Sequence, residues 1–89
     1  MLVLYLQLFA MKPFNGHINV EGETLQFTFY DAHTDRRKTF FVSVTRHGQP
    51  GTFNMIENDS GKWILVEPVA EWLKPLEGRL ALNVCCSQV

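Results

Sequence analysis

The chain has 89 residues, with eight lysine and arginine residues against nine aspartate and glutamate residues and a formal net charge of −1. A chain of this length forms one domain, because compact domains seldom divide below ~150 residues. Hydrophobic residues make up 46% of the sequence and aromatic residues 12%, which excludes a disordered chain. The lack of a basic excess argues against a general phosphate-binding surface, and six glycines and two cysteines exclude collagen-like and disulfide-rich proteins.

Residues 1–10 (MLVLYLQLFA) form an almost wholly apolar segment. Ten residues are too few to cross a bilayer, which takes about 20 in a helix, so we expect no membrane role. No charged residue precedes the apolar run, so it lacks the n-region of a secretory signal. Three interpretations stay open: an extra strand, an apolar arm (Leu2–Phe9) that covers a patch on its own or another subunit, or a mis-assigned start ahead of Met11. We expect residues 11–89 to form a single α+β domain.

Residues from about 17 to 67 show the two-residue period of strands that bury one face. Ile18 and Val20 mark a short first strand, and turn-forming stretches separate it from the strands that follow. The pattern predicts an antiparallel meander of four to five strands. The inward positions of the later strands supply the sheet half of the expected core: Leu25, Phe27, Phe29, Phe40, Val42, Val44, Phe53, Met55, Trp63 and Leu65.

The turns between these strands predict their pairing, because turn type and loop length set the register of a hairpin. Asn58–Gly61 suits a three-residue hairpin, the preceding turn is centred on Gly48 and Gln49, and a longer tip covers Asp31–Arg37. The expected partners are Met55–Leu65 and Ile56–Ile64 across the first of these turns, Val44–Phe53 and Phe41–Ile56 across the second, and Phe29–Phe40 and Phe27–Val42 across the tip.

The last quarter of the chain changes to a helical period. Pro68 fits the first turn of a helix, where its missing N–H costs nothing, and Pro75 is expected to kink or split that helix. We therefore expect a helix over about 68–84, packed across the inward face of the sheet to make two layers. Its apolar stripe recurs at intervals of three and four: Trp72, Leu73, Leu76, Leu80 and Val84.

Candidate metal ligands are few. Asp31, His33 and Asp35 would share one side of an extended segment, a donor set that can hold a divalent metal. The surrounding residue types favour a solvated hairpin tip instead. The adjacent Cys85 and Cys86 have neither a second cysteine pair nor a nearby histidine. We expect no metal, no cofactor and a reducing, cytoplasmic location.

No motif for catalysis surrounds the serines, cysteines or histidines: there is no G-x-S-x-G elbow and no glycine-rich phosphate loop that leads into a helix. We therefore expect no enzyme. Three consecutive basic residues, Arg36, Arg37 and Lys38, form a basic tip near the aromatic residues Tyr30 and Phe41. An alternative function is thus the binding of a small ligand or of single-stranded nucleic acid. Flanking carboxylates and the mildly acidic chain argue against nucleic acid as a partner.

The main hypothesis is a non-enzymatic protein-interaction module. The strand pattern leaves one sheet face uncovered by the helix, and apolar residues gather on it. In the expected register Phe41, Ile56 and Ile64 align across three strands, and Tyr30 lies diagonal to Phe41. A protein partner or a second copy of the chain, as in a homodimer, would cover this face. The candidate interaction residues are Tyr30, Phe41, Ile56, Ile64 and Val66.

Overall fold

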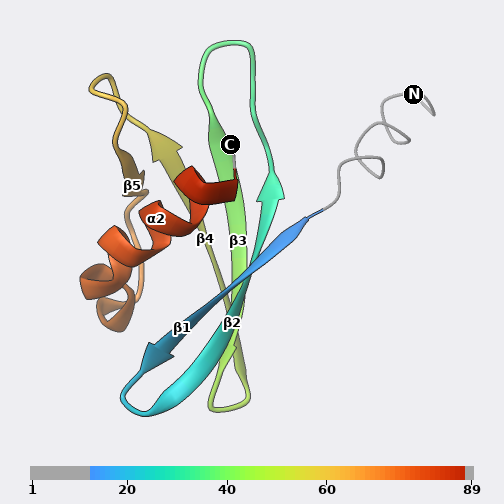
Figure 1. Cartoon of the computed structure of the whole chain (residues 1–89), viewed down its shortest axis with the longest axis vertical. Coiled ribbons are helices and arrows are strands. Elements are labelled where there is room, and N and C mark those ends of the chain that lie inside the picture. Colours follow the sequence, from blue (N-terminus) through green and yellow to red (C-terminus); the bar gives the residue numbers. More distant parts are fainter. Residues whose placement is uncertain (1–12, 88–89) are drawn as a thin grey trace, which may run out of the picture.

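The computed structural model describes residues 13–87, so the apolar segment 1–10 lies outside the described residues. Five strands come first and a short 3₁₀ helix leads directly into an α-helix (Figure 1). Their bounds are β1 Phe14–Val20, β2 Glu23–Asp31, β3 Thr39–Arg46, β4 Gln49–Glu57, β5 Trp63–Leu65, η1 Glu71–Leu76 and α2 Glu77–Ser87.

The strands form one sheet in the order β1-β2-β3-β4-β5, and each neighbouring pair is antiparallel. The predicted α+β meander is therefore confirmed, with a first strand that begins at Phe14, earlier than expected. Alternate residues of every strand point to the same side, and the large apolar residues on that inward side are buried, except Phe14, which is half-buried. Every residue of the predicted sheet half of the core is buried, and Ile18 and Val20 of β1 join it.

The predicted register between β3 and β4 is wrong by two residues. Val42 pairs with Phe53, whereas the sequence placed Val44 there. The chain reverses at His47 and Gly48, with φ of 52° and 73°. A tight two-residue hairpin turn of this kind needs positive φ at both positions, which Gly adopts freely and His tolerates better than most residues. Centring the turn one residue later, on Gly48 and Gln49, caused the error.

The register between β2 and β3 also differs by two residues from the prediction, since Phe29 pairs with Val42 and not with Phe40. Strand-like pairing continues beyond the strands into the tip. The Ala32 N–H donates to the Thr39 carbonyl at 3.0 Å, and the Thr34 N–H donates to the Arg37 carbonyl at 2.9 Å. The chain thus reverses between Thr34 and Arg37. A two-residue shift leaves each side chain on its original face, so the core survives both errors.

The register between β4 and β5 is confirmed, with Met55 opposite Leu65 and Ile56 opposite Ile64. The Asn58 side chain holds this turn, because its Oδ1 accepts hydrogen bonds from the N–H groups of Ser60 and Lys62 at 3.0 and 2.9 Å. The sequence identified this turn correctly since the asparagine and the positive-φ glycine both occupy the positions that the hairpin requires.

The helix begins later than predicted. Residues 68–70 lie outside it, η1 contains Pro75, and the α-helix starts only at Glu77. Proline has no N–H to donate and disfavours the helical conformation of the residue before it, and the regular α-helix begins only after Pro75. Of the predicted helix half of the core, Trp72 is only half-buried, whereas the remaining members of the stripe are buried: Leu73, Leu76, Leu80 and Val84.

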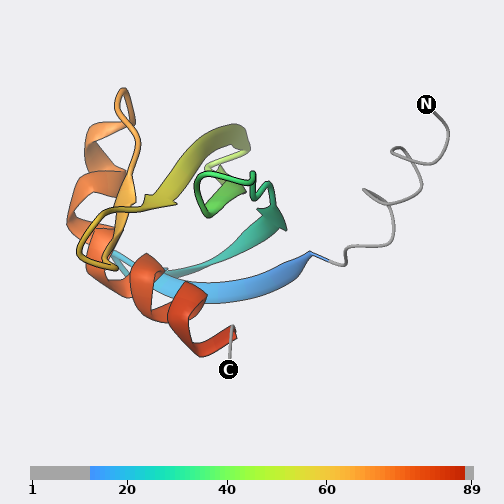
Figure 2. The same cartoon turned by 90° about the horizontal axis from the view of Figure 1, so that it is seen from above.

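Helix α2 lies between the two edges of a curled sheet. It packs against β5 near one end and against β1 further along, as seen from above in Figure 2. The Arg79 Nη1 atom donates to the Asn19 carbonyl on β1 at 3.0 Å. This arrangement covers the concave, inward side and leaves the opposite side of the sheet free of any other described element.

Candidate functional site

The corrected register regroups the five candidate interaction residues into two neighbouring rows on the outward side of the sheet. In one row Tyr30 lies directly opposite Phe41, and Phe41 lies opposite Asn54. Val66 completes this row, because its N–H donates to the Asn54 carbonyl at 2.9 Å. The predicted alignment of Phe41 with Ile56, and the diagonal placing of Tyr30, are therefore wrong.

The second row contains Ile56 and Ile64, which pair as predicted, with Thr39 on the other side of Ile56. Phe41 is two residues from Thr39 on the same strand, so Phe41 and Ile56 are diagonal neighbours. Diagonal partners lie roughly 7–8 Å apart, within reach of an aromatic ring. The two rows thus make one continuous surface, which we call the outer patch: Tyr30, Phe41, Ile56, Ile64 and Val66.

Two rings dominate the outer patch. Tyr30 and Phe41 are 42% and 40% exposed, and their ring centroids are 6.1 Å apart with the planes tilted by 46°. The other three residues are half-buried. An exposed aromatic pair on adjacent strands offers a large, stiff apolar contact area.

The whole outward side of the sheet carries no lysine, arginine, aspartate or glutamate within the five described strands. The charged strand residues, Glu23, Asp31, Arg46 and Glu57, stand at strand ends and on the inward side of the alternation. Apart from the outer patch and Pro50, the outward positions of the sheet hold threonine, serine, asparagine, glutamine and histidine. The polar residues on this outward side are Asn15, His17, Asn19, Thr24, Gln26, Thr28, Thr39, Ser43, Thr45, Thr52 and Asn54.

The basic tip is exposed, and acidic side chains lie close to it. Arg36, Arg37 and Lys38 line an open hollow of about 420 Å³ between the β2–β3 tip and the β4–β5 turn. Asp35, Glu57 and Asp59 line the same hollow, so its six charged side chains balance. A phosphate backbone would meet as many carboxylates as basic groups there.

The candidate metal ligands form a turn. The Asp31 Oδ1 atom accepts the His33 N–H at 2.9 Å, which is the geometry of an Asx turn. The His33 ring lies 5.0 Å from Phe40 and 6.4 Å from Trp63, centroid to centroid, and so packs on the hairpin. No group of three or more histidine, cysteine, aspartate or glutamate residues suited to a metal ion occurs within residues 13–87.

Lys74 on η1 lies beside two carboxylates. The Lys74 ammonium donates a hydrogen bond to the Glu71 carboxylate at 3.2 Å and lies 3.7 Å from Glu67, and together they raise the pKa of Lys74 above its ordinary value. These ion pairs lie on the surface of the protein. Cys85 is a free, exposed thiol.

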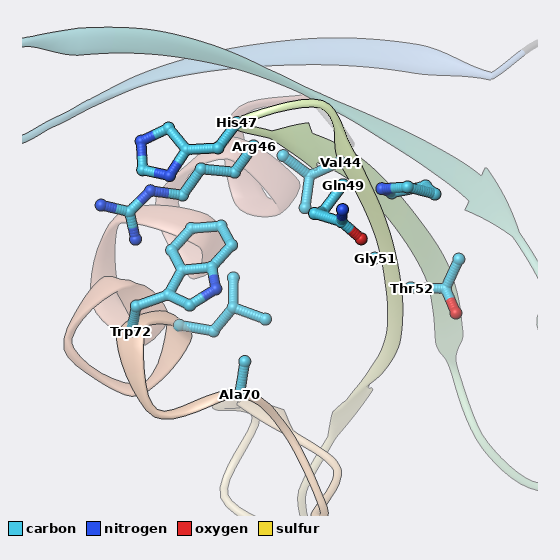
Figure 3. A pocket seen from close by; sticks show the side chains of 10 residues that line it. Val44, Arg46, His47, Gln49, Gly51, Thr52, Ala70 and Trp72 are labelled. Carbon is cyan, nitrogen blue, oxygen red and sulfur yellow. The ribbon is translucent and has the colours of Figure 1, made fainter.

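The sequence did not reveal a second hollow, of about 400 Å³, near the β3–β4 turn (Figure 3). Arg46 and Trp72 stand on one side of it and β4 on the other. Gly51 occupies an inward position of β4, between inward Phe53 and the turn, and leaves that position without a side chain. A glycine inside a strand often marks a close approach of a ligand or another backbone, and this was the available signal.

Comparison with protein-family models, curated proteins and solved structures finds no match for this chain. No helix in the part of the chain that the structure describes is long and apolar enough to cross a membrane.

Proposed function

We propose that the protein is a non-enzymatic interaction module, and that the outward side of its sheet pairs with the same surface of a second copy. The observation that carries this proposal is the absence of charged side chains on that surface of the described strands, around the exposed Tyr30–Phe41 pair.

Charge depletion is characteristic of interface cores, where aromatic residues are enriched and lysine, glutamate and aspartate are scarce. It also suits self-pairing. In a two-fold dimer one surface patch meets itself, so a charged residue near the axis would face its own copy. Like charges brought together across an interface cost several kcal/mol. An uncharged polar surface with an aromatic centre avoids that repulsion.

The size of the surface sets the scale of the proposed dimer interface. Five strands about 4.8 Å apart make a sheet roughly 20 Å wide, and about seven residues per strand make it roughly 23 Å long. The product, about 460 Å², is a little more than half of the ~800 Å² of accessible surface that each partner buries in a standard interface. A small domain gains stability from such burial because its own core is limited.

The alternative, binding of a small ligand or single-stranded nucleic acid at the basic tip, has less support, because carboxylates line the same hollow as Arg36, Arg37 and Lys38. A titration with a single-stranded oligonucleotide at two salt concentrations distinguishes it, since phosphate contacts weaken steeply with salt.

A reducing compartment such as the cytoplasm suits the free thiol of Cys85.

The test compares the parent protein with the double variant Phe41→Lys, Ile64→Lys. Light scattering over a range of concentrations reports the mass, and thermal melting reports the stability. We expect a concentration-dependent dimer for the parent and a folded monomer for the variant, because two lysines per copy would have to enter the interface.

Leu82→Lys is the matched control, since Leu82 is 65% exposed on α2, away from the outward side of the sheet. It should leave the dimer intact. A parent that stays monomeric, or a double variant that dimerises as well as the parent, would remove the proposal.

A further inference from the structure

Strand β4 has an edge that β5 covers only in part. β5 pairs with Met55, Ile56 and Glu57, and the last bond between the two segments runs from the Val66 N–H to the Asn54 carbonyl. Beyond this point, the β5 side of β4 from Gln49 to Phe53 has no partner strand among the described elements.

The Thr52 backbone points into this vacant space. In an antiparallel pair, successive residues alternate between groups that face one neighbour and groups that face the other. Asn54 faces the β5 side, because its carbonyl accepts the Val66 N–H. Thr52 lies two residues away and therefore presents its N–H and C=O on the same side. An unpaired row of this kind is a template for another strand.

A hollow of about 400 Å³ lies beside that edge, between β4 and the segment that holds Ala70, Trp72 and Leu73. Figure 3 shows Trp72 and Ala70 across the hollow from β4. Room for a side chain exists there because Gly51 has none: a Cβ at Gly51 would approach no atom closer than the Val44 carbonyl oxygen, 3.9 Å away. The volume lies in the range of ligand pockets, about 300–1,000 Å³.

The charged or titratable residues that line this hollow are all basic. Arg46 and His47 line the hollow, and no aspartate or glutamate does. The Arg46 guanidinium lies 4.6 Å from the Trp72 ring centroid, and its Nη2 atom bonds the exposed Glu21 carboxylate at 3.2 Å. Its Nε atom is buried and has no hydrogen-bond partner within the described residues. A ligand that brings a carboxylate would complement this end of the hollow.

We propose that this site binds the C-terminal end of an extended peptide. The peptide backbone pairs with Thr52 as an added antiparallel strand, one apolar side chain enters the hollow over Gly51, and the terminal carboxylate lies toward Arg46 and His47. Direction and charge agree: a strand antiparallel to β4 runs from Glu57 toward Gln49, so it ends beside Arg46. Strand addition at a sheet edge is an established mode of peptide recognition. The site is separate from the outer patch and does not depend on the proposed dimer.

Calorimetry with the full chain and the peptide acetyl-Thr-Val-Thr-Leu, with a free carboxylate, tests the proposal. Its matched probes are the same peptide with a C-terminal amide, and acetyl-leucine. We expect the acid to bind about tenfold more tightly than the amide, and acetyl-leucine to bind more weakly still. No binding of the acid at up to ~1 mM would overturn the proposal. So would acetyl-leucine binding as tightly as the peptide, since strand pairing would then contribute nothing.

Two variants separate the parts of the site. Gly51→Leu fills the hollow and should abolish peptide binding. Gly78→Leu adds the same side chain on α2, where an added Cβ would meet nothing within 4 Å outside the backbone of the helix itself, and should leave binding unchanged. Arg46→Gln should lower the affinity for the acid about tenfold, to that of the amide, and leave the amide unaffected. If Arg46→Gln lowered the affinity for the acid and for the amide equally, Arg46 would not be the partner of the terminal carboxylate. Melting curves verify that each variant is folded.

Discussion

The backbone N–H of Leu65 donates a hydrogen bond to the Oε2 atom of Glu77 at 2.9 Å, so the first residue of α2 caps the outer edge of β5. β5 is the last strand of the sheet, and its other side is occupied by β4. At the opposite edge the Arg79 guanidinium bonds the Asn19 carbonyl of β1. Two side chains of one helix therefore form hydrogen bonds with backbone groups of the two edge strands, β5 and β1. Exposed strand edges invite aggregation, and these contacts protect them.

The Glu77 contact predicts a stability difference between two variants. Glu77→Ala leaves the part-buried Leu65 N–H without its acceptor, which costs roughly 1–3 kcal/mol of unfolding free energy. Glu77→Gln keeps an oxygen in place and should cost clearly less. Urea unfolding measures both. Glu71→Ala is the control, because the Glu71 pair with Lys74 is exposed to solvent and should contribute little to stability. Equal losses for the Gln and Ala variants would show that the hydrogen bond is not the cause.

The packing of the core predicts that replacing Phe27 by alanine lowers the free energy of unfolding more than replacing Trp72 does. Phe27 has no exposed surface, so Phe27→Ala should cost roughly 3–5 kcal/mol. That is a large share of the ~4–13 kcal/mol available to a chain of this size. Trp72 is half-buried and its ring carries the Arg46 guanidinium, so Trp72→Ala should cost less. Chemical denaturation ranks them, and a larger loss at Trp72 would contradict the observed packing.

The sequence predicted the faces of the strands better than their pairing. Alternation assigns each side chain to one side, and a two-residue error in register does not change that assignment. The pairing depends on where the chain reverses, and both errors arose at turns with more than one possible centre. The tight turn is formed by His47 and Gly48. It requires a positive φ at His47, which the sequence does not indicate. At the Asn58 turn the side-chain acceptor and the glycine left only one choice, and the register was correct.

The candidate surfaces were predictable to different degrees. The outer patch follows from alternation, so Tyr30 and Phe41 could be placed on the outward side from the sequence alone. The hollow beside Gly51 could not, because it exists only where β5 ends early and η1 lies across from β4. A long-range arrangement of this kind leaves no periodic signal.

Two glycines with different backbone conformations should respond to alanine in opposite directions. Gly48 has a φ of +73°, so Gly48→Ala forces an L residue into the left-handed region and should destabilise the protein by about 1–2 kcal/mol. Gly78 lies in α2 in open space, so Gly78→Ala should stabilise the protein by about 0.5–1 kcal/mol. Thermal melting measures both. A loss of stability at Gly78 would indicate a packing role that its surroundings do not show.

The proposed dimer should be insensitive to salt, because the outward surface of the described strands carries no charged side chains. Raising sodium chloride from about 0.1 M to about 1 M shortens the Debye length from about 10 Å to about 3 Å and weakens contacts between charges. An interface of aromatic, aliphatic and neutral polar side chains has few such contacts, so its dissociation constant should change by less than about threefold. Thr45→Lys provides the contrast, because this exposed outward position would bring like charges together across the two-fold axis. That variant should dimerise poorly at low salt and recover in part at high salt. Sedimentation equilibrium at both salt concentrations measures the two constants. A parent dimer that weakens tenfold or more at high salt would mean that charged groups, such as those of the basic tip, hold the copies together.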